Sequence, residues 1–240
     1  SFLPHDGNSS TPERIALMER ALAFLRAHFP HLRVEGFLAD REFIGEAWFR
    51  YLEEKGIPRC IRIKANTRMW RLGSGPRAWE LFASLKVGES RVPRRRYWVY
   101  GRRMWVVGLR LGVREWLIVA TDLDPHRVLE VYGLRWGIER LFGALKGRGF
   151  DLEATHVTRG ERLSRLLVPL SLAFVWAFRT GLVLHRVRPV RPKKHGRLGQ
   201  SLFRAGLDLL TLWALALWGA GGGRRGSPLG LCPMEVLTCT

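Results

Sequence analysis

Residues 132–146 divide into a polar face and an apolar face when they are wound as an α-helix. Each helical residue advances by about 100°, so Tyr132, Arg135, Glu139 and Lys146 fall within an arc of roughly 60°. The aliphatic side chains of the segment form a second stripe that would anchor the helix to a core. The segment therefore predicts one helix that displays a carboxylate, two cations and a phenol together. A plain surface helix with a weak ion pair between Arg135 and Glu139 is the alternative interpretation.

The net charge indicates a polyanionic partner. The chain has 240 residues and a formal net charge of +19. Nucleic acid is the default partner for such a charge. The three cysteines are too few and too scattered for a disulfide framework or a zinc site, which favours a reducing compartment. The apolar runs 166–178 and 209–218 fall short of the about 20 residues that cross a bilayer, so we expect two buried helices and no membrane partner.

The first quarter of the chain predicts alternating helices and strands. A capping box of Ser10 and Glu13 begins a helix over residues 12–28. Strands at 32–39 and 57–64 flank a helix at 46–55. Asp40 follows the first of these strands directly, at the carboxyl end where α/β sheets place ligands. A lone aspartate in this position is otherwise a helix cap.

Residues 65–121 change character to short alternating runs broken by glycine, which predict antiparallel strands. Tryptophans in this segment are interleaved with arginines. Aromatic rings stack on nucleic acid bases while cations follow the phosphate backbone. Tryptophans also fill the cores of small sheets, so we assign no single tryptophan to base stacking.

The last third predicts helices separated by linkers. We expect an apolar helix over residues 162–184, a basic linker at 185–200, a final helix at 201–218 and a glycine-rich linker at 219–228. Before the 132–146 segment, Asp122 and Asp124 are interpreted as helix caps, with Asp124 at the N-cap and Pro125 at the first helical position.

Two sequence blocks, in the correct order, resemble the DDE transposases of bacterial insertion sequences, and within them insertion sequence family four. The first is Ala-Asp-Arg-Glu-Phe-Ile at 39–44, followed by the strand at 61–64, which resembles the second-aspartate block of that family. The second is the spacing of tyrosine, arginine, glutamate and lysine within 132–146. Trp136 and Phe142 also match that signature.

The resemblance implies an α/β, RNase H-like (retroviral integrase-like) catalytic core with an antiparallel β-stranded insertion at 65–121. It implies that Asp40 and Glu139 are two of three acidic ligands for Mg²⁺ or Mn²⁺, and that Tyr132, Arg135 and Lys146 contact DNA phosphates. The implied activity is cut-and-paste transposition, by phosphodiester hydrolysis followed by strand transfer. Its partners would be the DNA of the element ends and target and a second copy in a synaptic complex, in the cytoplasm at the nucleoid.

The family's first catalytic aspartate lies on a strand upstream of the helix predicted at 12–28. Asp6 is the sole aspartate before that helix in this sequence, and it lies in a polar turn. We therefore expect residues 1–240 to be an amino-terminally truncated catalytic domain that is inactive alone. The alternative is a non-enzymatic DNA-binding remnant of a transposase.

Overall fold

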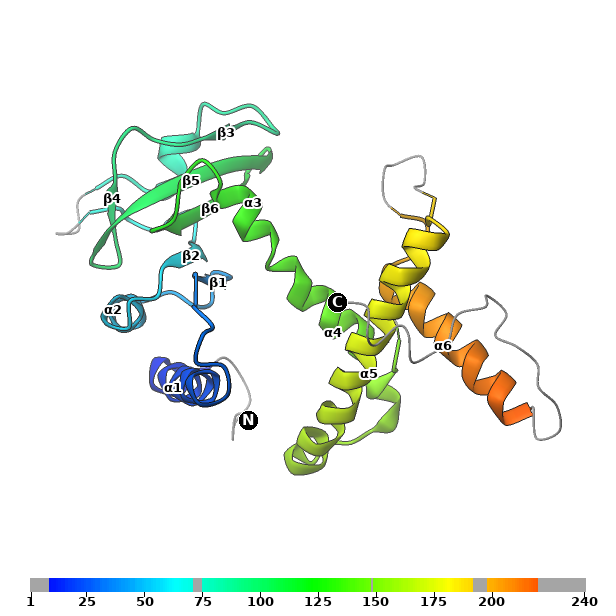
Figure 1. Ribbon diagram of the computed structural model, residues 1–240. Helices are drawn as coiled ribbons and strands as arrows, with labels where there is room; N and C mark the ends of the chain where they lie inside the picture. The colour runs from blue at the N-terminus through cyan, green and yellow to red at the C-terminus, as the bar shows by residue number, and fades with distance from the viewer. Residues whose placement is uncertain (1–8, 71–74, 148, 192–197, 220–240) are drawn as a thin grey trace. The chain divides into compact units, whose positions relative to one another are not determined.

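The computed structural model describes residues 9–70, 75–147, 149–191 and 198–219 (Figure 1). The chain divides into two compact units, Phe2–Trp136 and Gly137–Thr240. We call them the amino-terminal and carboxyl-terminal units and describe each by itself.

The amino-terminal unit begins with helix α1 (Thr11–His28), which confirms the helix predicted at 12–28. The capping box is formed in both directions: the Glu13 amide donates to Ser10 Oγ at 3.5 Å, and the Ser10 amide donates to Glu13 Oε2 at 2.7 Å. Strand β1 (Phe37–Ala39) is shorter than the strand predicted at 32–39. Leu32 and Val34 are exposed in the segment that leads into it.

The sheet of this unit mixes parallel and antiparallel pairs. Strands β1 and β2 (Arg59–Arg62) run parallel and are joined through helix α2 (Glu46–Glu54). Beyond β2, the order continues through β6 (Glu115–Thr121) and β5 (Arg102–Gly112) to β3 (Ser90–Arg91), and β4 (Tyr97–Val99) pairs with β5. The protein is therefore a mixed α/β fold with one mixed sheet.

The strands β3, β5 and β6 of residues 65–121 lie in the same sheet as β1 and β2. Strand β6 pairs directly with β2, so these strands extend the sheet that β1 and β2 begin. Strands β4 and β5 are joined by Tyr100 and Gly101, whose φ angles are 46° and 75°. Positive φ at both central residues is the geometry of a two-residue hairpin turn, which glycine adopts without strain.

The two faces of the sheet bury separate cores. On one face, α1, α2 and the 3₁₀ turn η1 (Ala78–Phe82) contribute to the main core, which includes Trp48, Phe49 and Ile61. On the other face, Cys60 packs with Val128 and Tyr132 of helix α3 (Val128–Gly133). Neighbouring residues of β2 thus enter opposite cores, as the alternation of a strand requires. This places α3 across the sheet from α2.

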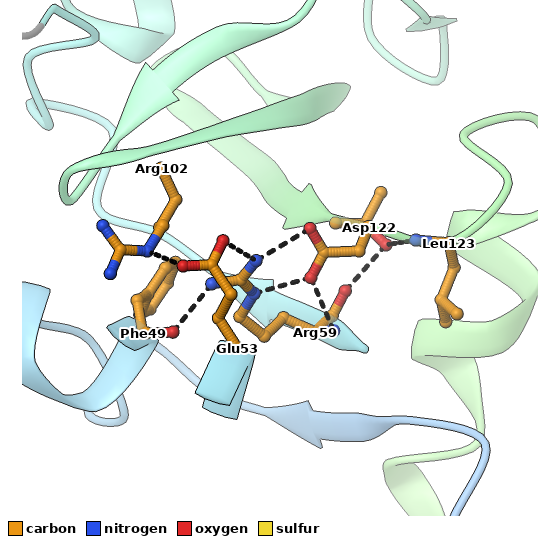
Figure 2. A network of polar contacts seen from close by, with 7 residues as sticks. Phe49, Glu53, Arg59, Arg102, Asp122 and Leu123 are labelled. Carbon is orange, nitrogen blue, oxygen red and sulfur yellow. Dashed lines mark hydrogen bonds and ion pairs between the residues drawn. The ribbon is translucent and has the colours of Figure 1, made fainter. Parts of the chain in front are cut away.

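A buried ion pair fixes the connection between β6 and α3 (Figure 2). Arg59 donates from Nε and Nη2 to the two carboxylate oxygens of Asp122, at 2.6 and 2.9 Å, and from Nη1 to the Phe49 carbonyl at 2.8 Å. Glu53 approaches the same guanidinium and also pairs with Arg102. The Arg59 side chain is only 5% exposed.

Asp122 is therefore not a helix cap, contrary to the sequence interpretation, because both of its oxygens are committed to Arg59. Asp124 accepts a hydrogen bond from the His126 amide at 3.0 Å. Helix α3 itself begins at Val128, with Arg127 at the N-cap and no side-chain capping bond. The predicted N-cap at Asp124 is wrong, since the turn it stabilises ends before the helix starts.

The carboxyl-terminal unit contains most of helix α4 (Trp136–Leu145), a 3₁₀ turn η2 (Leu152–Thr155), and helices α5 (Gly160–Val187) and α6 (Leu202–Gly219). Helices α5 and α6 cross closely at two glycines. A Cβ atom added at Gly181 would lie 1.8 Å from the Leu202 carbonyl oxygen, and one at Gly206 would lie 1.8 Å from that of Ala177. Backbone contact of this kind requires residues without side chains.

Helix α5 is longer and more exposed than the sequence predicted. It continues through Pro169 and past Arg179 to Val187, so the first residues of the linker predicted at 185–200 are helical. Among described residues it is the one helix long and apolar enough to cross a membrane, and 17% of its most apolar window is buried. The helix predicted at 162–184 is confirmed, and the prediction that it is buried is wrong. Residues 192–197 and 220–228 of the predicted linkers lie outside the described part of the chain.

Candidate functional site

Asp40 lies immediately after β1, at the carboxyl end of the parallel pair, as the sequence predicted. Its Oδ1 accepts a hydrogen bond from the Arg41 amide at 2.7 Å and lies 3.8 Å from Nη1 of Arg62, the last residue of β2. The Asp40 side chain is 37% exposed. The carboxylate is therefore fixed by local contacts and still open to solvent.

Tyr132 reaches the same end of the sheet from α3. The residue is 4% exposed, and its hydroxyl makes no hydrogen bond of good geometry with a described residue. Burial raises the pKa of the phenol, and the nearby Asp40 carboxylate raises it further, whereas Arg135 and Arg62 lower it. The phenol is neutral at physiological pH and has a proton to donate.

Arg135 completes this group of side chains from the turn after α3. Its guanidinium lies 5.5 Å from the ring centre of Tyr132 and 5.7 Å from that of Trp136. Stacking of this kind holds a planar guanidinium in place through its face and does not use its N–H groups as hydrogen-bond donors. We call Asp40, Arg62, Tyr132 and Arg135 the strand-end corner. It joins three predicted site residues to Arg62, to which the sequence analysis assigned no role.

The helix predicted over residues 132–146 is interrupted. Helix α3 ends at Gly133 and α4 begins at Trp136, and the Arg135 amide bonds to the Tyr132 carbonyl at 3.1 Å, three residues back. Gly133 and Gly137 flank the turn, and glycine is a poor helix former. The arc calculated for a continuous helix therefore does not apply to the four polar residues.

Glu139 and Lys146 belong to the carboxyl-terminal unit. Glu139 is an exposed residue of α4, and Lys146 follows the helix with its Nζ 3.3 Å from Glu153 Oε1. Asp40, Tyr132 and Arg135 belong to the amino-terminal unit. The structure thus brings three of the predicted residues together and leaves the predicted pairing of Asp40 with Glu139 untested.

A polar cavity of about 780 Å³ lies between α2 and the β4–β5 hairpin. Its walls include two tryptophans and three arginines: Trp70, Trp98, Arg68, Arg102 and Arg103. By contrast, Trp79 and Trp116 pack against the main core with their ring centres 6.0 Å apart. The structure thus shows which tryptophans line a cavity and which pack in the core. The spacing of tryptophans in the sequence did not distinguish these two groups.

The described residues contain oxygen donors suitable for a hard divalent cation but do not gather three of them. Asp40 and Glu139 supply the carboxylates that Mg²⁺ prefers. No three His, Cys, Asp or Glu side chains of the described ranges come together as a metal-binding group. The donor chemistry fits such an ion, and the number of donors falls short of an all-protein site.

The family model described as transposase DDE domain matches residues 6–176 of the chain. The matched range includes all five predicted site residues. No curated protein gives a match.

Proposed function

The chain belongs to the transposase DDE domain family, and we propose that it engages DNA through the strand-end corner as a cut-and-paste transposase of insertion sequence family four. Membership implies an RNase H-like fold and a DNA substrate, and transposases of this family generally use a divalent metal. The mixed α/β sheet agrees with such a fold. The single observation that carries the proposal is the corner itself, where Arg62 and Tyr132 lie near the Asp40 carboxylate at the end of parallel strands and Arg135 stacks on the Tyr132 ring.

In this proposal Asp40 and Glu139 are two acidic ligands of Mg²⁺ or Mn²⁺, which when bound would activate water and stabilise charge on phosphate oxygens. The protein's own groups orient the DNA. Arg135 donates hydrogen bonds to phosphate oxygens from its stacked position, and the Tyr132 hydroxyl donates a hydrogen bond to a neighbouring oxygen. Lys146 adds a further cation when it exchanges its exposed contact with Glu153 for phosphate.

We further propose that these residues are an incomplete catalytic domain, inactive alone. One observation supports this. Among the described residues, β1 pairs with β2 on one edge and with no strand on the other. An additional strand on that open edge would end beside Asp40, where a third carboxylate is required.

The second candidate is a DNA-binding remnant without nuclease activity. The cavity along the β4–β5 hairpin favours it, because arginines and exposed aromatic rings bind single-stranded nucleic acid without any metal. In either case we propose DNA and not a membrane as the partner, pairing of two copies at the element ends, and a cytoplasmic, nucleoid-associated location. The close backbone contact of α5 with α6 supports the role of α5 as a packed helix.

The test is a Mg²⁺-dependent nicking assay on DNA that carries the element ends. We expect residues 1–240 to bind this DNA without cutting it, and a longer chain that supplies a third carboxylate on a strand beside β1 to cut it. Asp40→Asn and Glu139→Gln should each abolish cutting by the longer chain. Glu130→Gln is the matched control, because Glu130 is an exposed acidic residue of α3 with no predicted role.

Three outcomes distinguish the alternatives. Cutting that survives Asp40→Asn or Glu139→Gln would refute the assigned site. Cutting by the 240-residue chain would refute incompleteness. Salt-sensitive binding with no cutting by either chain would favour the remnant.

A further inference from the structure

Arg62 is the member of the strand-end corner that no sequence signal singled out. It ends β2, opposite Val119 of β6, and its side chain is 23% exposed. The alternation of β2 places it on the same face as Cys60, the face that α3 covers. Its charge is close enough to Tyr132 to lower the pKa of that phenol. Arg62 therefore lies between the carboxylate and the residues proposed to hold phosphate.

The contact between Arg62 and Asp40 is a weak one. The closest atoms are 3.8 Å apart, whereas a charge-assisted hydrogen bond is about 2.7–2.9 Å long. The same Asp40 oxygen already accepts a hydrogen bond from the Arg41 amide. At the other end of β2, Arg59 makes bonds of 2.6 and 2.9 Å to Asp122 and is nearly buried. One arginine of the strand is locked in place, and the other is exchangeable.

The Arg62 guanidinium and the Asp40 carboxylate carry opposite single charges, so each compensates the other while no metal is bound. A divalent cation at Asp40 would remove this compensation and repel the Arg62 guanidinium at this short range. A DNA phosphodiester is the anion that would then compensate, and the planar fork of arginine matches its oxygens.

We propose that Arg62 is a positioning residue with two alternating partners: it neutralises Asp40 while the metal is absent and binds a DNA phosphate once a divalent cation occupies Asp40. This inference rests on the proposed role of Asp40 as a metal ligand. The exchange of partners makes the binding of metal and the binding of DNA cooperative, because each ligand lowers the free-energy cost of binding the other.

The experiment measures Mn²⁺ binding by electron paramagnetic resonance, and duplex DNA binding with and without Mn²⁺. In Arg62→Gln we expect Mn²⁺ affinity to rise by about twofold to fivefold, since the ion no longer displaces an ion-paired guanidinium. We expect DNA affinity in Mn²⁺ to fall by about tenfold, the value of one charged hydrogen bond, with a smaller loss in metal-free buffer. A structural defect would weaken both ligands, so the opposite signs are the signature.

Two further variants sharpen the result. Arg62→Lys keeps the charge and loses the fork, so it should hold Mn²⁺ affinity at the parent value and lower DNA affinity. Arg165→Gln removes an ion-paired arginine of α5 and should leave Mn²⁺ affinity unchanged. Far-ultraviolet circular dichroism establishes folding of each variant, and Arg62→Lys carries the test if Arg62→Gln does not fold.

Asp40→Asn separates this inference from the function on which it rests. If Asp40→Asn weakens Mn²⁺ binding and Arg62→Gln fails to strengthen it, the role of Arg62 is wrong and Asp40 stays a ligand. If Asp40→Asn leaves Mn²⁺ binding unchanged, or the parent chain binds none, both the ligand role of Asp40 and the inference are overturned.

Discussion

Removing Asp122 should destabilise the amino-terminal unit far more than its place near the surface suggests. Asp122→Ala strips three hydrogen bonds from Arg59, two from the guanidinium and one from its amide. The charge left behind is 5% exposed and keeps the Phe49 carbonyl and the longer contact with Glu53. Breaking a buried pair from one side costs about 3–5 kcal/mol, and we expect the lower end because Asp122 itself is 28% exposed.

Arg59→Met should cost less, about 1–2 kcal/mol, because it removes the buried charge together with its partner contacts and leaves an apolar side chain against the Phe49 ring. The double variant should then be about 2 kcal/mol more stable than the sum of the single effects predicts. The free energy of unfolding is measured by urea denaturation, and hydrogen exchange of the β2 and β6 peptides assigns the change to this unit.

The exposed pair of Arg127 and Glu130 on α3 supplies the control cycle. Its closest atoms are 3.8 Å apart and its side chains are 68% and 75% exposed, so its coupling should stay below about 0.5 kcal/mol. If the effects of Arg59→Met and Asp122→Ala add to within about 0.5 kcal/mol, the network is not a coupled unit and our account of the β6–α3 connection fails.

Two more predictions concern packing. Gly181→Ala places a Cβ 1.8 Å from the Leu202 carbonyl oxygen and should lower the stability of the α5–α6 pair by at least about 1–3 kcal/mol. Gly137→Ala in α4 meets no atom within 4 Å and should raise the stability by about 0.5–1 kcal/mol. Urea titration of both variants measures the two effects, and equal effects would refute the close crossing of α5 and α6. Burial raises the pKa of the Cys60 thiol to about 12, so iodoacetamide at pH 8 should leave Cys60 unmodified in the folded protein and modify it in urea, as read by peptide mass spectrometry. Rapid labelling of the folded protein would contradict the burial of Cys60 against Val128 and Tyr132.

Local signals predicted the elements of the amino-terminal unit well. The Ser10 capping box begins α1 as predicted, and α2 forms within the range predicted for a helix at 46–55, because signals of this kind depend on neighbours in the chain. The position of Asp40 followed from the end of an apolar run for the same reason. These features required no knowledge of what lies across the sheet.

Features that depend on distant partners were predicted poorly. From its neighbours in the sequence alone, Asp122 was predicted to be a helix cap. It pairs with Arg59 because β6 runs antiparallel beside β2. The helix over 132–146 was predicted from periodicity, which does not register a turn at Leu134 and Arg135. Leu134 and Ile138, assigned to its apolar stripe, are 72% and 50% exposed. Periodicity alone thus overestimated the continuity of the segment.

The two arginines of β2 show that residue type and a family signature do not decide which residues serve the site and which serve the fold. Arg59 and Arg62 lie three residues apart on one strand, and each has an aspartate as partner. Alternation directs them to opposite faces, and depth then separates their chemistry: Arg59 is enclosed beneath α2 and its bonds are short, whereas Arg62 stays solvent-accessible and its contact is long. A buried arginine cannot leave its partner without the cost of an uncompensated charge, so it serves the fold. An accessible one can exchange a carboxylate for a phosphate at little cost, and for that reason we assign DNA recognition to Arg62 and architecture to Arg59.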